Sequence, residues 1–172
     1  MIAKHVGSSD ALAKAVGATL EGLTFYEFAH VVAADTRVKV TFEDLGRRKK
    51  AELAKLEAVA GKAAKEVSVR PGIFPLDSVS KAECYVCGHI VETGQMPEQC
   101  PKCGTARYTF EKEISLAKAW EIAGEAARKS AAFFRELKSQ AGPDGKSVLD
   151  ELAKMEDALA TEAGQELAEL RG

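Results

Sequence analysis

The sequence lacks the features that would direct a protein to nucleic acid or to a membrane. It carries 24 basic and 26 acidic residues and a formal net charge of -2, so it has no overall positive field to attract nucleic acid or anionic lipid. No apolar run approaches the roughly 20 residues that span a bilayer. The first ten residues also lack the charged-then-apolar order of a secretory signal. We therefore expect a cytoplasmic protein with neither nucleic acid nor a membrane as its partner.

Aromatic residues, proline and histidine are scarce as well. Aromatics make up 6% of the 172 residues, and there are 5 prolines and 3 histidines. Apolar residues nevertheless reach 46%, and a chain with this composition is typically folded and mostly helical. Its length suits one sizeable domain, or one domain with a small module. No phosphate-binding glycine loop is present, and no Ser-His-Asp order is supported, so nucleotide-binding and hydrolase functions have no basis in the sequence.

The spacing of apolar residues predicts four helices. Capping signals place the starts of the first, second and fourth, and the double-proline segment 70–75 is interpreted as a linker that cannot continue a helix. A sharp turn is expected at 142–145. The helices are expected from Ser8, Ser9 and Asp10 to about Ala34, from Thr41 and Asp44 to Gly61, from about Ser115 to Gln140, and from Ser147 and Asp150 onward.

The two halves of this helical pattern resemble each other. Phe25-Tyr26 aligns with Phe133-Phe134, and the segment 41–45 aligns with 148–152, at offsets of 108 and 107 residues. Two related hairpins can bury their apolar faces against each other in a four-helix bundle. In a ferritin-like order, the connection between the second and third helices would cross the whole bundle. The aromatic pairs and Trp120 are expected in its core or at a subunit interface.

The four cysteines lie in two short knuckles of identical pattern. Each Cys-x-x-Cys loop lets two sulfurs hold one metal ion, and the glycine that follows suits the left-handed position that ends such a turn. In a reducing compartment such pairs are metal ligands more often than disulfides. The pattern predicts a tetrahedral four-thiolate site for which zinc and a single iron are both suitable. The knuckles comprise Cys84, Cys87 and Gly88, and Cys100, Cys103 and Gly104.

The run from Glu83 to Phe110 resembles the rubredoxin-type domain of rubrerythrins. The resemblance rests on Cys-Tyr-Val-Cys-Gly, Met-Pro-Glu at 96–98, Cys-Pro-Lys-Cys-Gly and the closing Tyr-Thr-Phe at 108–110. The flanking helices are similar to the ferritin-like domain of that family, although the family usually places the rubredoxin module at one end of the chain. The fold expected is mostly α: a ferritin-like four-helix bundle of two hairpins with a rubredoxin-like β module inserted between helices two and three.

This resemblance implies one iron, bound by Cys84, Cys87, Cys100 and Cys103, that passes single electrons. It also implies an oxidoreductase or electron carrier in peroxide defence, with a redox partner protein. Because long connections allow hairpins to be exchanged between subunits, a homodimer is expected. The expected divisions are 1–78 for the first hairpin and linker, 79–113 for the metal domain and 114–172 for the second hairpin.

The di-iron centre of rubrerythrins is not expected. That centre takes a glutamate from each of two helices and Glu-x-x-His from the other two. Only one of the six matching positions carries the family's residue, so a peroxidase activity of its own is not expected. The buried lysine that results would need to reach solvent or to pair with a carboxylate. The six positions are Thr19, Ala127, Lys49, Glu52, Glu156 and Leu159, of which Glu156 matches.

Other charged residues have two interpretations each. Glu27 and His30 form a Glu-x-x-His pair, interpreted as a surface pair, with a metal site shared between subunits as the alternative. The basic run Arg47–Lys50 is interpreted as a solvated helix face, with docking of an acidic redox partner as the alternative. His89 is expected to tune or cover the metal site.

The alternative function from the sequence is a non-enzymatic scaffold or interaction protein in which zinc only stabilises the cysteine module. A third possibility, a nucleic-acid-binding zinc ribbon, is disfavoured because acidic residues balance the basic ones around the cysteines.

Overall fold

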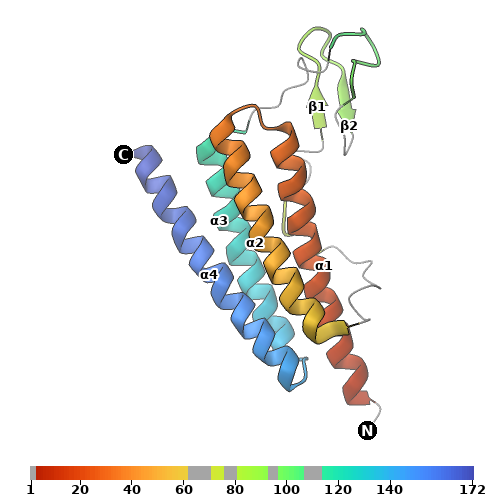
Figure 1. Cartoon of the computed structure of the whole chain (residues 1–172), viewed down its shortest axis with the longest axis vertical. Coiled ribbons are helices and arrows are strands. Elements are labelled where there is room, and N and C mark those ends of the chain that lie inside the picture. The colour runs from red at the N-terminus through yellow and green to blue at the C-terminus, as the bar shows by residue number, and fades with distance from the viewer. Residues whose placement is uncertain (1–2, 62–70, 76–80, 93–96, 107–113) are drawn as a thin grey trace.

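The described part of the chain forms four long helices, with a small β hairpin between the second and third. The structure is a computed structural model that describes residues 3–61, 71–75, 81–92, 97–106 and 114–172 (Figure 1). None of the helices described has the length and apolar character needed to cross a membrane. The mostly α fold expected from the sequence is confirmed. The elements are α1 (Ala3–Val32), α2 (Thr36–Ala60), β1 (Lys81–Glu83), β2 (Ile90–Glu92), α3 (Leu116–Lys138) and α4 (Pro143–Arg171).

The helices pack as two hairpins, α1 with α2 and α3 with α4. Figure 1 shows that α2 and α3 run in the same direction, so the chain between them returns along the length of the bundle before α3 begins. This is the crossover connection that a ferritin-like order requires. The β1–β2 hairpin lies beyond the end of the bundle at which α1 ends and α3 begins (Figure 1).

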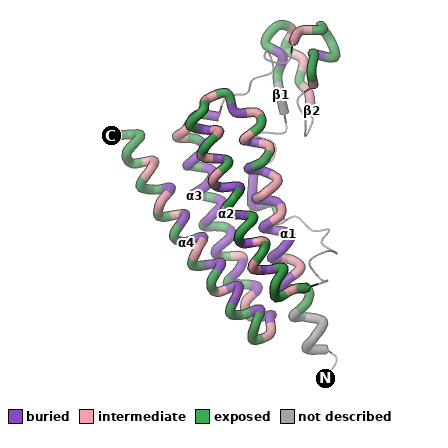
Figure 2. The backbone as a smooth tube through the Cα atoms, in the orientation of Figure 1, coloured by how far each residue is buried: buried purple, intermediate pink, exposed green. Residues whose placement is uncertain are grey.

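The internal repeat is visible in the core. Tyr26 and its counterpart Phe134 are both buried, and Phe25 lies edge-on to Tyr26 with ring centroids 5.5 Å apart. Trp120 is also buried, whereas Phe133 is only partly buried. Figure 2 shows the buried residues recurring along all four helices. These aromatic residues therefore lie in the core or against it, which is one of the two places that the sequence predicted for them. Burying a large apolar side chain contributes about 1.5–3 kcal/mol.

Two of the predicted helix starts were wrong because the helices begin earlier. Helix α1 continues through Asp10, whose carboxylate pairs with Lys14 one turn later at 2.9 Å, a spacing that stabilises a helix. Helix α2 is capped by Asp35, whose side chain accepts a hydrogen bond from the backbone N–H of Arg37. The Thr41 hydroxyl, predicted to cap this helix, instead donates to the carbonyl of Arg37 inside it.

The predicted start of the fourth helix was also wrong. Helix α4 begins at Pro143, directly after Gly142, so Ser147 and Asp150 lie within it. Proline suits the first position of a helix because an N–H group there would have no hydrogen-bond acceptor within the helix. The other boundaries agree with the sequence. Ser115 caps α3, and α2 ends at Gly61, which has a φ of 55°.

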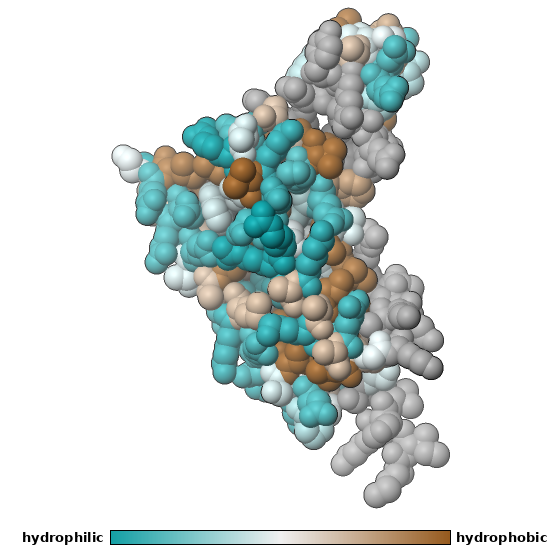
Figure 3. Space-filling view, viewed as in Figure 1, coloured by the Kyte–Doolittle hydropathy of each residue, from teal (hydrophilic) through white to brown (hydrophobic). Residues whose placement is uncertain are grey.

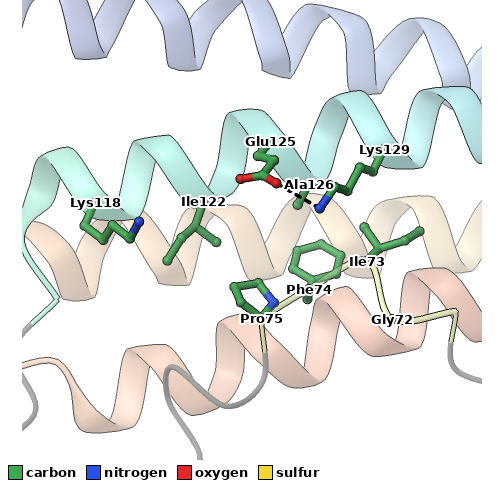
Figure 4. Close-up of a pocket in the computed structure, with 9 residues that line it drawn as sticks. All are labelled: Gly72, Ile73, Phe74, Pro75, Lys118, Ile122, Glu125, Ala126 and Lys129. Carbon is green, nitrogen blue, oxygen red and sulfur yellow. Dashed lines mark ion pairs between the residues drawn. The ribbon is translucent and has the colours of Figure 1, made fainter.

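Residues 71–75 form a strap that packs against the bundle. The strap is not helical, as predicted, but it is fixed: the Glu21 carboxylate accepts the backbone N–H groups of Gly72 and Phe74, both at 3.0 Å. The Phe74 ring is buried against Phe25 and Tyr26, with centroid distances of 5.5 and 5.3 Å. A pocket of about 270 Å³ lies between the strap and α3, and Figure 4 shows Phe74 and Pro75 facing α3 there. The strap is therefore part of the core on this side of the bundle.

Candidate metal centre

The two cysteine knuckles have the same backbone geometry. In the first, the N–H of Cys84 donates to the carbonyl of His89 at 2.9 Å, and the N–H of Gly88 donates to the carbonyl of Cys84 at 2.8 Å. In the second, the N–H of Cys100 donates to the carbonyl of Thr105, and the N–H of Gly104 donates to the carbonyl of Cys100, both at 2.8 Å. Gly88 and Gly104 have φ values of 70° and 75°, as the sequence predicted for the left-handed positions.

An antiparallel pairing joins the two segments that flank each knuckle. Strands β1 and β2 pair with Glu83 opposite Ile90, directly flanking the first knuckle. A single bridge between Gln99 and Ala106 flanks the second knuckle in the same way. Each knuckle is therefore a tight turn between two paired segments.

The four sulfurs form a cluster with the dimensions of a metal cage. The Sγ atoms of Cys84 and Cys103 lie 3.7 Å apart, and so do those of Cys87 and Cys100. All four lie within 4.8 Å of one another. A tetrahedron with metal–sulfur bonds of about 2.3 Å has edges of about 3.8 Å, whereas a disulfide needs a sulfur separation of about 2.05 Å. The donor set thus fits one tetrahedral ion and no disulfide.

The protein surroundings favour thiolates at some of these positions and oppose them at others. Burial opposes ionisation of Cys84, but backbone N–H groups of Cys87 and Val86 lower its pKa to about 6. The Thr105 hydroxyl and N–H lower the pKa of Cys103. At Cys87 the His89 N–H acts in the same direction, but burial and the neighbouring sulfurs raise the pKa to about 11. Four thiolates at this spacing repel one another, so the full donor set requires a bound cation.

The cage is open on one side. Cys84 and Cys100 are 1% and 2% exposed and form their own small buried cluster, while Cys87 is half-buried and Cys103 is exposed. The first knuckle also presents apolar side chains to solvent at Tyr85, Val86 and Ile90. The second knuckle therefore brings a sulfur ligand to the protein surface.

Comparison with known proteins agrees with this geometry. Residues 83–111 match the family model described as the rubrerythrin, rubredoxin-like domain. The cysteine module is a rubredoxin-like domain. No curated protein and no solved structure was found to match the chain. The rubredoxin-like domain lies between α2 and α3, and the four surrounding helices are consistent with the ferritin-like bundle expected from the sequence.

Outside the rubredoxin-like domain, the positions that match the di-iron ligands of rubrerythrins all lie inside the bundle. They do not converge on a metal-binding donor set: among the described residues, the four cysteines are the one group of three or more potential ligands close enough to share an ion. Instead the ammonium of Lys49 lies between two carboxylates. The positions are Thr19, Lys49, Glu52, Ala127, Glu156 and Leu159, each no more than 4% exposed.

We call Lys49, Glu52 and Glu156 the core charge cluster. The Lys49 Nζ donates to Glu52 Oε2 at 2.9 Å and also to Glu156 Oε1. Of the two arrangements expected for a lysine at this position, an amine that reaches solvent or an amine paired with a carboxylate, the structure has the second. Lys49 and Glu156 are 107 residues apart, which is the offset of the internal repeat, so equivalent positions of the two hairpins meet at the centre of the bundle.

One ammonium cannot neutralise two carboxylates, and the pKa values reflect this. Burial raises the pKa of Glu156 to about 7, with Lys49 opposing the shift and Glu52 adding to it. Burial acts to lower the pKa of Lys49, but Glu156 and Glu52 hold it above its ordinary value. Burial and the same carboxylates raise the pKa of Tyr26. The Tyr26 hydroxyl and Glu156 Oε2 are buried without a hydrogen-bond partner among the described residues. The cluster thus favours one carboxyl proton near neutral pH.

The structure does not bring Glu27 and His30 together as ligands. The His30 Nδ1 bonds the carbonyl of Lys39 at 3.0 Å, and because a carbonyl only accepts, this nitrogen carries the ring proton. The Glu27 carboxylate instead pairs with Lys50 at 3.2 Å. The surface-pair interpretation is therefore the one that these contacts support.

The basic run on α2 is neutralised within the chain. Arg47 pairs with Glu43, Arg48 pairs with Asp44 and Glu162, Lys50 pairs with Glu27, and Lys49 is buried in the core charge cluster. Figure 3 shows hydrophilic residues gathered over α2 on the face in view. For Arg47, Arg48 and Lys50 these contacts support the interpretation as a solvated helix face rather than as a free basic docking surface, whereas Lys49 is 1% exposed and that interpretation was wrong for it.

Two residues that bear on these sites were not identified from the sequence. Glu21 fixes the strap from 51 residues away, a distance at which no local pattern gives a signal. Thr105 places its hydroxyl 2.8 Å from the Cys103 sulfur. Thr105 stands two residues after the second cysteine of its knuckle, as His89 does in the first knuckle. That shared position is the signal from which Thr105 could have been identified.

Proposed function

We propose that the protein is a one-electron carrier of the rubrerythrin type that binds a single iron through Cys84, Cys87, Cys100 and Cys103. The observation that carries the proposal is the cage of four sulfurs, held by two matched knuckles, in which two opposite edges are 3.7 Å and all four sulfurs lie within 4.8 Å of one another. When bound in such a cage, iron supplies one-electron chemistry with little rearrangement of its ligands. The chain holds the sulfurs in place and directs backbone N–H groups toward them.

Exposure of the second knuckle supports transfer to another protein. Electrons must pass between the site and a partner at the surface, and Cys103 is exposed while Cys84 and Cys100 remain buried. We propose a redox partner protein, a cytoplasmic location and a homodimer as the setting for this activity. A place in peroxide defence is also proposed, as an electron carrier rather than as a peroxidase, because Lys49 lies among the carboxylates in the bundle.

Elemental analysis and a visible spectrum of the full-length protein from an iron-replete source test this proposal. We expect about one iron per chain and the red colour of an oxidised iron–thiolate centre, which a one-electron reductant bleaches. A Cys100→Ser variant should lose the colour and the metal together. A colourless protein with one zinc per chain would overturn the proposal and favour zinc as a structural ion in a non-enzymatic scaffold.

A peroxide turnover assay with an electron donor tests the second part of the proposal. We expect the purified protein alone to give no turnover above that of the Cys100→Ser variant. Turnover that persists in this variant and depends on added iron would place a metal centre in the bundle and contradict the assignment as a carrier.

A further inference from the structure

The two knuckles of the rubredoxin-like domain differ at one structurally equivalent position. His89 and Thr105 each stand two residues after the second cysteine, and each accepts the backbone N–H of the first cysteine, at 2.9 and 2.8 Å. The backbone N–H of each also bonds the sulfur of the second cysteine. The backbone roles of the two residues are therefore the same, and at this position the two halves of the cage differ only in the side chain.

At Thr105 the side chain adds a bond to the cage. The Thr105 hydroxyl oxygen lies 2.8 Å from the Cys103 sulfur. In a metal-bound cage the sulfur has no proton, so the hydroxyl must be the donor. Among the hydrogen bonds of the described residues, none joins the His89 imidazole to a sulfur. The cage is therefore asymmetric, with one extra donor at its exposed ligand.

We propose that Thr105 tunes the reduction potential of the centre by donating its hydroxyl hydrogen bond to the Cys103 thiolate. This inference rests on the proposed function, since only an iron-bound cage has such a potential. Reduction adds one electron from the partner protein and makes the centre more negative by one charge, with no bond made or broken. A hydrogen bond to sulfur stabilises the more negative state, so Thr105 raises the potential. Thr105 acts as a positioning residue through the sulfur ligand.

Potentials of iron-reconstituted, full-length variants test this role. Thr105→Val keeps the shape of the side chain and removes the donor, whereas Thr105→Ser keeps the donor. We expect Thr105→Val to shift the equilibrium with a fixed redox mediator toward the oxidised form by up to about tenfold, which corresponds to about 59 mV for a one-electron couple. Thr105→Ser should remain close to the wild type. An unchanged potential in Thr105→Val, or an equal shift in both variants, would overturn the proposal.

The first knuckle supplies a reciprocal control. His89→Thr places a hydroxyl at the equivalent position beside Cys87, and His89→Val is its matched variant without the donor. We expect the threonine variant to have the higher potential of the two, the same sign as at position 105. The sulfur-to-iron charge-transfer band should also move to longer wavelength in Thr105→Val, because loss of the donor raises the energy of the sulfur electrons. A band unmoved by this change would count against a bond to the ligand.

The test of Thr105 can fail or succeed independently of the test of the proposed electron carrier. If the native protein contains zinc, the proposal of an electron carrier fails, but the iron-reconstituted chain still shows whether Thr105 shifts the potential. If the native protein contains iron and Thr105→Val leaves the potential unchanged, the electron carrier stands and the tuning role fails.

Discussion

The rubredoxin-like domain and the core charge cluster each gather acidic groups around a place for a cation, and they obtain that cation differently. In the domain, four cysteine sulfurs lie within 4.8 Å of one another, and the cation must come from solution. In the bundle, the chain supplies its own cation, because the ammonium of Lys49 lies between Glu52 and Glu156. An ammonium has one charge and cannot take up an electron, so one-electron chemistry is suited to the domain and not to the centre of the bundle.

The two regions also differ in their exposure to water. Lys49, Glu52 and Glu156 are each no more than 2% exposed, so their mutual attraction is weakly screened and the loss of any one charge is costly. The cage reaches the surface at Cys103. The comparison therefore predicts that changes to the core charge cluster affect folding, whereas changes around the cage affect metal and redox properties.

The largest effect on folding is expected for Lys49→Met. This change leaves Glu52 and Glu156 facing each other without a cation, and removal of one partner from a buried ion pair costs about 3–5 kcal/mol. Urea unfolding of the metal-loaded protein measures this loss. Lys50→Met is the matched control on the same helix, because Lys50 is exposed and its pair with Glu27 is worth about 1 kcal/mol or less.

A rescue experiment shows whether charge is the cause. Adding Glu52→Gln and Glu156→Gln to Lys49→Met removes the unpaired carboxylates, so most of the lost stability should return. If the triple variant is as unstable as Lys49→Met, or if Lys49→Met and Lys50→Met lose the same amount, the core charge cluster does not have the role assigned to it.

A smaller effect is expected in the dependence of stability on pH. The pKa of Glu156 is raised to about 7 from an ordinary value of 4.5, so between these pH values the folded state binds more protons than the unfolded state. Stability from this group is therefore present at low pH and falls as the pH rises through the window. The change is at most about 3.5 kcal/mol, from about 1.4 kcal/mol for each pH unit. Glu156→Gln should remove this decline, measured as unfolding free energies at pH 5 and 7.5.

Asp150 provides a control of opposite sign. Hydrogen bonds from Lys138 and Lys154 lower its pKa to about 2, so its contribution is lost only as the pH falls from about 4 toward that value. Asp150→Asn should leave the difference between pH 5 and 7.5 as it is in the wild type. A decline that survives in Glu156→Gln would assign the proton to another group.

The sequence predicted most reliably where the signals were local or repeated. The ligands of each knuckle lie within four residues, so spacing alone indicated the sulfur cluster, and the positive-φ glycines followed from the same pattern. The internal repeat predicted the bundle. For Lys49 the sequence left two arrangements open, an amine that reaches solvent or an amine paired with a carboxylate, and the observed partner, Glu156, stands at the repeat offset of 107 residues.

Helix starts and long-range polar contacts were harder to predict. Thr41 and Ser147 have capping-box spacing but lie inside α2 and α4, because a cap is a weak signal that neighbouring packing overrides. The bonds from Gly72 and Phe74 to Glu21 join residues more than 50 positions apart. Nothing in the local sequence marks that contact, since it depends on the path of the crossover.

The smallest of these effects concerns the strap that covers the core charge cluster. Phe74 lies over Lys49, with the ammonium 5.9 Å from the ring centroid. A Cβ atom at Gly22 would lie 2.8 Å from the Phe74 ring and 3.1 Å from Lys49 Cε. Overpacking of this kind costs about 1–3 kcal/mol, partly offset by the better helix propensity of alanine. We therefore expect Gly22→Ala to destabilise by about 1 kcal/mol, whereas Gly164→Ala, with no atom within 4 Å, should stabilise by about 0.5–1 kcal/mol.

A double-mutant cycle with Phe74→Ala identifies the source of that loss. If the alanine at position 22 is harmful because it meets the Phe74 ring, its cost should disappear once the ring is removed, and the helix-propensity gain seen at position 164 should emerge. Independent, additive effects would mean that the strap yields to the new methyl group. In that case Phe74 would not be a rigid cover over Lys49, and the burial of the core charge cluster would have to come from the four helices alone.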